Sequence, residues 1–174
     1  MSPSTAELQA QLDHIRASPA DAGSLAMIVR RPSVGEREVL ETGELDTTVG
    51  LIGDSWNGRE RVDPDAQLNV MNARIAELLA PDELTRAQAG DQLYLDIDLS
   101  DDNLPAGSRL RVGDAVIEIT PKPHTGCAKF AARFGADVTR FVNTGEGKRL
   151  HLRGVCAKVV EAGTIRRGDP VAKV

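Results

Sequence analysis

The sequence predicts a mainly β (α+β) fold built from short strands and tight turns, with a few peripheral helices. Residues 93–99 alternate between aliphatic side chains at odd positions and Tyr or Asp at even ones, the period of a half-buried strand. Residues 110–112 and 115–119 flank Gly113-Asp114, a two-residue connection suited to a tight hairpin. Four Gly-Asp dipeptides punctuate the chain, and three of them adjoin expected strands, as turn residues do in β-rich proteins.

The N-terminal segment predicts a short helix. Leu8, Leu12 and Ile15 form one apolar stripe at helical spacing, and Pro19 follows where the helix would end. We therefore expect residues 1–23 to be an N-terminal helical extension, followed by a single domain over residues 24–174.

The rest of the first half carries strand and helix signals in alternation. Residues 24–29 are apolar and β-prone, and residues 38–48 are a weaker strand candidate broken at Gly43. Apolar residues at helical spacing predict a second helix over residues 70–79, which Pro81 stops.

The C-terminal part predicts further strands. Residues 152–160 form one apolar strand candidate. Residues 164–167 and 171–174 are expected to pair with each other around the turn at 168–170. The string at 143–148 lacks the spacing of a phosphate-binding loop and predicts a flexible turn.

Composition excludes several classes of protein. Aromatic residues make up only 3% of the 174 residues, which argues against a stacking platform for single-stranded nucleic acid. The net charge of −5 also argues against nucleic acid as the main partner. No apolar stretch reaches the length of a membrane span, no secretory core is present, and two cysteines do not make a disulfide framework. We therefore expect a cytoplasmic protein with no nucleic-acid or membrane partner.

Cys127 is the most reactive candidate in the sequence. It lies in the loop Pro121-Lys122-Pro123-His124-Thr125-Gly126-Cys127-Ala128-Lys129, outside any apolar run. Positive charge on Lys122, His124 and Lys129 would favour the thiolate, which can be a nucleophile, a sulfur carrier or a soft-metal ligand. Cys156, in an apolar segment, is expected to pack in the core.

Three kinds of site remain open at this point. A zinc site from two His and two Cys has the right residue types, but His151 and Cys156 are five apart in one expected strand and would face opposite sides. A Cys-His thiol enzyme would use His124 beside Cys127. An anion site is the third, because residues 122–153 hold seven basic and two acidic residues in a chain that is acidic overall. A solvated basic face would give the same charge pattern.

Several motifs together resemble the MOSC domain family, named after the C-terminal domain of molybdenum cofactor sulfurases. They are, in order, Gly50-Leu51-Ile52-Gly53-Asp54-Ser55-Trp56, then Asp102-Asn103-Leu104-Pro105-Ala106-Gly107, Arg111-Val112-Gly113-Asp114-Ala115, Pro123-His124-Thr125-Gly126-Cys127-Ala128-Lys129-Phe130 and Val160-Glu161-Ala162-Gly163-Thr164-Ile165-Arg166-Arg167-Gly168-Asp169-Pro170-Val171. The resemblance runs from about Ser24 to the C-terminus. It implies a closed or partly open β-barrel of short strands with a few peripheral helices, so that residues 24–174 would be a MOSC-like barrel domain.

The resemblance also implies a function. Cys127 matches the cysteine that is proposed to carry sulfur in the family and to ligate molybdenum in its reductase members. A molybdopterin-type cofactor, an anion, would then be the ligand, and no pyridoxal phosphate is expected on this chain. The family often has Arg where this chain has Ser55, and Arg59 or Arg61 would have to replace it.

The resemblance and the residue types together suggest roles for a small set of residues. Cys127 would be the catalytic sulfur or the molybdenum ligand, and Gly126 would let the backbone approach the ligand closely. The remaining expected cofactor contacts are Lys122, His124, Lys129, Asn103, Asp54 and Arg133.

Three functions are compatible with these residues. The first is a stand-alone MOSC-like domain that binds molybdenum cofactor or carries sulfur on Cys127, as a sulfur transferase or carrier. The second is a molybdenum-dependent reductase of small N-oxygenated compounds, and the third is a non-catalytic binding module that retains the fold. The expected partner is an anionic cofactor or a small-molecule ligand. The first two would need a separate sulfur donor or redox partner protein.

Overall fold

Eleven strands form the centre of the molecule, and the computed structural model describes the whole chain, residues 1–174. The strands are β1 (Gly23–Arg30), β2 (Glu38–Leu40), β3 (Thr42–Asp46), β4 (Gly50–Leu51), β5 (Leu68–Asn72), β6 (Leu93–Asp96), β7 (Arg109–Val112), β8 (Ala115–Ile119), β9 (Val155–Glu161), β10 (Gly163–Arg166) and β11 (Pro170–Lys173).

Seven of these strands close into a mixed β-barrel. Their order is β11-β7-β8-β9-β5-β6-β1, and β11 pairs with β1 to complete the ring. Only β5 and β6 run parallel, because a helical connection carries the chain back between them. Strand β2 extends β1 outside the ring, and β10, β3 and β4 form a second small sheet. The predicted mainly β fold and the implied barrel are confirmed.

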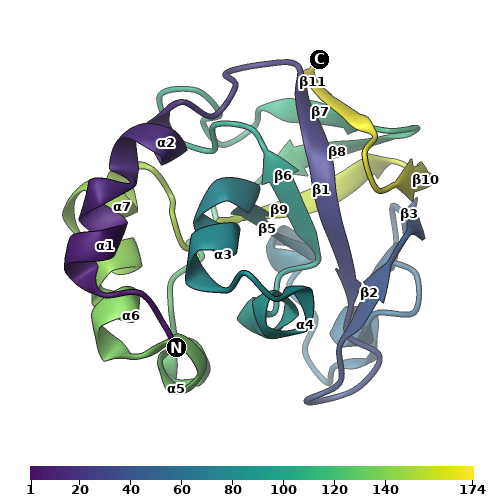
Figure 1. Ribbon diagram of the computed structural model, residues 1–174. Helices are drawn as coiled ribbons and strands as arrows, with labels where there is room; N and C mark the ends of the chain where they lie inside the picture. The colour runs from purple at the N-terminus through teal and green to yellow at the C-terminus, as the bar shows by residue number, and fades with distance from the viewer.

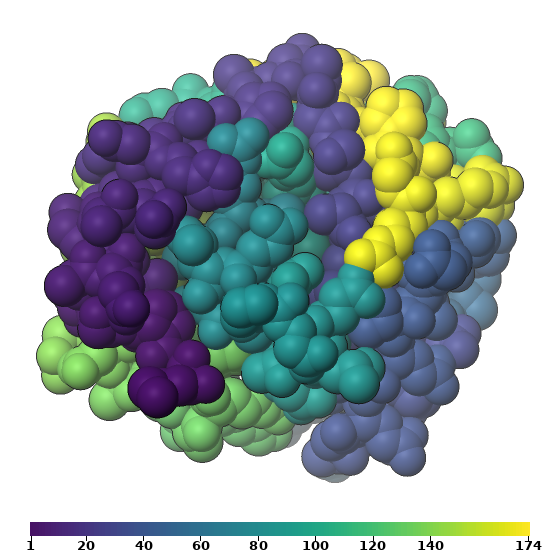
Figure 2. All heavy atoms as spheres, viewed as in Figure 1, coloured from purple at the N-terminus to yellow at the C-terminus, as the bar shows by residue number.

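Short helices cover one side of the barrel (Figure 1). They are α1 (Thr5–Ala10), α2 (Leu12–Arg16), α3 (Ala73–Leu79), α4 (Glu83–Arg86), α5 (Ala128–Phe134), α6 (Ala136–Asn143) and α7 (Gly145–Arg149), with 3-10 turns η1 (Ser55–Gly58), η2 (Pro64–Ala66) and η3 (Ala87–Ala89). Figure 2 shows the purple N-terminal segment lying beside the green segment that holds α5 to α7. None of the helices combines the length and apolar character needed to cross a bilayer.

Two hydrophobic clusters hold these layers together. Aliphatic side chains such as Leu93, Leu95 and Ile97 fill the barrel interior, as their alternation predicts. Tyr94, between them in sequence, points the other way and packs in a second cluster between the barrel wall and the helices. Leu8, Leu12 and Ile15 of the N-terminal stripe are buried in this second cluster. Burial of each of these side chains stabilises the fold by about 1.5–3 kcal/mol. The division at residue 23 stays a prediction.

The predicted helix over residues 70–79 is partly wrong. Residues 68–72 are the buried strand β5, and α3 starts only at Ala73. The Asn72 side chain sets this boundary, because its Oδ1 accepts hydrogen bonds from the backbone N–H groups of Arg74 and Ile75. Both faces of β5 are buried, Val70 in the barrel and Met71 against the helices. A strand buried on both faces lacks the alternation by which strands are recognised.

The pairing expected at the C-terminus is also wrong. Strand β10 pairs with β3, whereas β11 pairs with β7 and β1. The turn between them is held by Asp169, whose Oδ2 accepts from Arg166 N, and by Gly168, whose N–H donates to Leu25 O at 2.7 Å. The chain therefore leaves one sheet at this turn and enters the other.

Two smaller differences concern glycines. Gly43 lies inside β3 and the break between β2 and β3 falls at Glu41. The expected flexible turn at 143–148 covers the end of α6, Thr144 and most of α7, in which Gly147 is buried against the preceding helix. Helices α5, α6 and α7 interrupt the β-rich second half.

Candidate functional site

A cavity of about 910 Å³ opens where the β1–β2 loop, η1, the turn after η3 and the loop carrying Cys127 meet. Six cationic side chains line it and no carboxylate does, although the whole chain carries a net charge of −5. The six are Arg31, Arg37, Arg59, Lys129, Arg133 and Arg153. Such a lining concentrates positive potential in a concave space and attracts anions.

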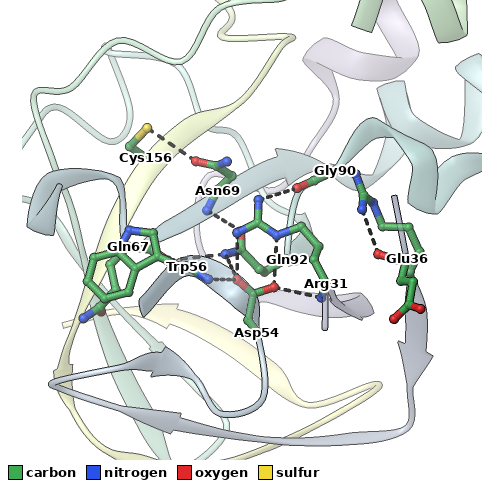
Figure 3. A network of polar contacts seen from close by, with 10 residues as sticks. Arg31, Glu36, Asp54, Trp56, Gln67, Asn69, Gly90, Gln92 and Cys156 are labelled. Atoms are coloured by element: carbon green, nitrogen blue, oxygen red, sulfur yellow. Dashed lines mark hydrogen bonds and ion pairs between the residues drawn. The ribbon is translucent and has the colours of Figure 1, made fainter. Parts of the chain in front are cut away.

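Arg31 is fixed by a buried carboxylate behind the cavity wall. Its Nε lies 3.0 Å from Asp54 Oδ1, and its Nη2 lies 2.8 Å from Asp54 Oδ2 (Figure 3). Asp54 also accepts from the backbone N–H groups of Arg31 and Trp56. Burial alone would raise the pKa of Asp54, but the hydrogen bonds and charge of Arg31 outweigh it and lower that pKa. This pair is therefore ionised and rigid.

A second buried carboxylate, Asp91, holds two further lining residues. Its Oδ1 lies 2.8 Å from His124 Nε2, and its Oδ2 lies 2.7 Å from Arg153 Nη1. Burial would raise the pKa of Asp91, but the charges of Arg153 and His124 outweigh it, and the pKa is lowered. Arg153 also stacks on Phe130 of α5, 4.6 Å from the ring centroid. Asp91 thus joins the cysteine loop and α5 to the barrel.

The other four cations have no carboxylate partner within 4.0 Å; they are Arg37, Arg59, Lys129 and Arg133. Burial, with the charges of Arg133 and Arg31 nearby, lowers the pKa of Arg37. In addition, the Nε atoms of Arg37 and Arg153 are buried and have no hydrogen-bond partner. Buried donors are normally paired, so these atoms indicate where an acceptor from a ligand could bind.

The Cys127 thiol is exposed at the wall of this cavity, at the start of α5. The backbone N–H of Phe130 is the main cause that lowers its pKa, against the raising effect of burial. The N–H of Lys129 and the charge of Arg153 lower it further. The lowered pKa expected from the sequence is present, but its origin is chiefly the backbone of α5. Lys122 pairs instead with Asp63, at 2.9 Å.

The loop in front of Cys127 is fixed by α6. Asn143 Oδ1 accepts from Gly126 N at 2.8 Å, and Asn143 Nδ2 donates to Gly126 O at 3.1 Å. A Cβ at position 126 would lie 3.0 Å from Thr139 Cγ2 and 3.1 Å from Asn143 Nδ2. The backbone at Gly126 therefore lies close against α6, and its two hydrogen bonds to Asn143 hold the cysteine loop against the helix layer.

The structure brings together four of the residues singled out from the sequence. Cys127, His124, Lys129 and Arg133 all line the cavity. Lys122, Gly126, Asp54 and Asn103 do not; Asp54 acts behind Arg31. Asn103 donates to Ala20 O and Asp98 O and so stabilises a turn outside the cavity. No spacing rule in the sequence distinguishes an asparagine with this turn role from one that contacts a ligand.

Sequence reasoning missed Arg31, Arg37 and Asp91. Arg31 and Arg37 lie in the β1–β2 loop, which carries none of the motifs, and Asp91 belongs to a Gly-Asp dipeptide that predicts only a turn. Ser55, which stands where the family often has Arg, lines the cavity. Of the two arginines that would replace the missing one, Arg59 also lines the cavity and Arg61 does not.

The zinc constellation weighed above does not come together. No group of three or more His, Cys, Asp or Glu side chains could hold a metal ion. His151 pairs with Asp101, and Cys156 is a buried free thiol whose Sγ lies 3.6 Å from Asn69 Oδ1. Burial raises the pKa of Cys156 to about 11, so its packing role is consistent with a protonated thiol.

Comparisons with known proteins agree with this architecture. Solved structures with the same fold include the YiiM protein of Escherichia coli (TM-score 0.58, 18% identity, 87% of this chain and 69% of that one) and YuaD of Bacillus subtilis (0.58, 14%, 86% and 94%). A protein described only as hypothetical gives a TM-score of 0.61 at 18% identity, over 88% of this chain and 68% of the other. No curated protein matches the chain significantly in sequence. The family model of the MOSC domain matches residues 62–172, more than half of the chain, which therefore belongs to the MOSC domain family.

Proposed function

We propose that the cavity binds a molybdopterin-type cofactor and that Cys127 is the residue that carries sulfur or ligates the molybdenum. The observation that carries the proposal is a thiol of lowered pKa in the wall of a cavity lined by six cations and no carboxylate. Thiolate is the ligand type that soft metal–sulfur chemistry prefers, and the cofactor is an anion. Membership of the MOSC family supports the same assignment.

The residues of the cavity fit such a group. Four cations lack an internal counter-ion, and two buried guanidinium Nε atoms lack an acceptor. Arg59, Lys129 and Arg133 would neutralise the bound anion, while Arg31 and Arg153 are held rigid by their carboxylates. When bound, the cofactor would supply a redox-active molybdenum centre able to exchange oxygen and sulfur ligands.

His124 would assist at the same wall. Its Nε2 is bound to Asp91, and its Nδ1 makes no hydrogen bond within the protein and is not among the buried unpaired atoms. Because Asp91 fixes the ring, Nδ1 is left to form a hydrogen bond with whatever occupies the cavity.

As a sulfur carrier, Cys127 would act by thiol–persulfide exchange. Its thiolate would attack the terminal sulfur of a cysteine persulfide on a separate donor protein. A new S–S bond to Cys127 forms, the donor's S–S bond breaks, and the donor leaves as a thiolate. The exchange consumes no external oxidant or reductant, and the lowered pKa of Cys127 raises the fraction of reactive thiolate at neutral pH.

Native mass spectrometry of protein purified from cofactor-producing cells tests the proposal. We expect either a bound pterin or, after incubation with a persulfide donor, a mass increase of one sulfur atom located on Cys127. The variant Cys127→Ser should lose the sulfur addition, whereas Cys156→Ser should keep it because Cys156 is buried.

A charge-reversal pair tests the cavity separately. Arg133→Glu, in the cavity, should reduce cofactor retention, whereas Arg140→Glu, exposed on α6 and outside the cavity, should not. Absence of both cofactor and sulfur addition in the unsubstituted protein would refute the proposal and leave a non-catalytic binding module. Turnover of N-hydroxylated compounds by cofactor-loaded protein with a reducing dye would assign the reductase activity in place of the carrier role.

A further inference from the structure

The turn that ends η3 gathers arginine side chains at one wall of the cavity. Its three last carbonyl groups each accept a hydrogen bond from a different guanidinium: Gln88 O from Arg133 Nη1 (2.8 Å), Ala89 O from Arg153 Nη2 (3.0 Å) and Gly90 O from Arg31 Nη1 (3.1 Å). These three arginines come from α5, the segment before β9 and the start of the β1–β2 loop, so the turn joins three distant parts of the chain. Figure 3 shows Arg31 reaching Gly90 on one side and Asp54 on the other.

Arg37 completes this group, and we call the four residues Arg31, Arg37, Arg133 and Arg153 the arginine cluster. Arg31 and Arg153 are each neutralised by a buried carboxylate, at 2.8 and 2.7 Å. Arg37 donates only to the carbonyl of Glu36, and Arg133 only to that of Gln88. The arginine cluster therefore holds two positive charges that the protein does not balance.

Gly90 leaves a gap between the two unbalanced guanidinium groups. A Cβ atom at this position would lie 3.5 Å from Arg37 Nη2 and 3.9 Å from Arg133 Nη1. Gly90 also has a φ of +90°, a conformation that L side chains rarely adopt. Both guanidinium tips therefore face a position that carries no side chain, on the wall of the cavity.

We propose that Arg37 and Arg133, above Gly90, bind a terminal phosphate group, that is, a dianionic phosphomonoester. Two unbalanced cations match a dianion, and guanidinium groups form paired hydrogen bonds with tetrahedral oxyanions. The buried Nε of Arg37, which has no partner in the protein, supplies a further donor. The assignment rests on the proposed function, since it names the group by which the cavity holds its cofactor.

Small phosphate esters test the arginine cluster without the cofactor. In titration calorimetry at low ionic strength, phenyl phosphate, a dianionic monoester, is expected to bind to the cofactor-free protein, and dimethyl phosphate, a monoanionic diester, is not. Arg37→Gln and Arg133→Gln should each weaken the binding of phenyl phosphate by roughly tenfold to a hundredfold, as loss of a charged hydrogen bond does. Arg140→Gln, exposed and paired with Asp137 outside the cavity, is the matched control and should bind normally.

Three outcomes would overturn the assignment. They are equal binding of the diester, unchanged binding in both glutamine variants, and binding of phenyl phosphate to cofactor-loaded protein, which would assign the arginine cluster to a second phosphorylated ligand. If Arg37→Gln does not fold, Arg37→Lys keeps the charge without the paired geometry, and it should still bind the ester more weakly than the unsubstituted protein. Sulfur transfer to Cys127 involves neither Arg37 nor Arg133. Its failure alone would therefore refute the carrier role and leave the phosphate site intact.

Discussion

Asp91→Asn is the substitution that tests the architecture of the site most directly. The carboxylate is fully buried and accepts from His124 Nε2 at 2.8 Å and from Arg153 Nη1 at 2.7 Å. Asparagine has the same shape but only one acceptor oxygen, so its NH₂ group must face one of these two donors. The guanidinium of Arg153 would then be buried without a counter-charge.

The expected loss is about 3 kcal/mol in the free energy of unfolding, the lower end of the range for breaking a buried ion pair. The lower end applies because Arg153 keeps two other contacts: its Nη2 donates to Ala89 O at 3.0 Å, and it lies 4.6 Å from the Phe130 ring centroid. Adding Arg153→Met should restore part of the loss, since no buried charge then remains unpaired.

Urea unfolding followed by far-ultraviolet circular dichroism measures both variants. A loss below about 1 kcal/mol in Asp91→Asn would refute the reasoning, because that is the size of an exposed pair. The double variant being less stable than the single one would refute it equally.

The same pair predicts a dependence on pH. The folded-state pKa of Asp91 is lowered below its value in the unfolded chain, about 3.9. Its contribution is therefore fully present above that value and is lost as the pH falls through the folded-state pKa. The stability difference between the protein and Asp91→Asn should shrink below about pH 4. A difference that stays constant into strong acid would contradict this reading.

Three further predictions concern the helix layer. Iodoacetamide should modify Cys127 and spare Cys156 in the folded protein. The rate of Cys127 modification should reach half of its maximum at a pH below about 8.5, the usual pKa of a free thiol. Peptide mapping across a pH series measures both, and equal labelling of the two cysteines would contradict the prediction. Gly147→Ala should lower the free energy of unfolding by about 2 kcal/mol or more, because a Cβ atom there meets the backbone of the preceding helix. Thermal unfolding measures the loss, and Gly58→Ala, which has open space around its Cβ, is the control. Asn143→Ala should cost about 1–3 kcal/mol by removing two hydrogen bonds to the cysteine loop, measured by urea unfolding, and an unchanged midpoint would count against that anchoring role.

Local patterns predicted the barrel strands in which residue type alternates between the two faces, although Tyr94 on the outer face of β6 is buried as well. The alternation around Tyr94 separates barrel interior from helix layer, as found, and Gly113-Asp114 forms the expected hairpin between β7 and β8. The errors arise where burial on two faces removes the alternation, as in β5, and where pairing depends on distant segments, as between β10 and β3. Neither effect is encoded in neighbouring residues.

The candidate site divides in the same way. Cys127 and His124 share one loop with turn-forming and basic residues, so their proximity follows from the sequence. Arg31 lines the cavity, and Asp91 holds His124 and Arg153 there, only because β1 and β6 are neighbours in the barrel. Their partners are 23 and 62 positions away along the chain, a separation at which only the tertiary fold determines contact.

Closure of the barrel by its last strand limits the order in which the strands can pair during folding. Strand β11 pairs with both β1 and β7, so the ring joins residues near 23 with residues near 171. During synthesis, the start of β1 at Gly23 and Ser24 therefore keeps an unpaired edge until β11 has emerged from the ribosome, whereas β2 can pair with the end of β1 much earlier. Closure of the ring is then a late event in the folding of this domain, and such long-range pairing is slow compared with the formation of the local helices.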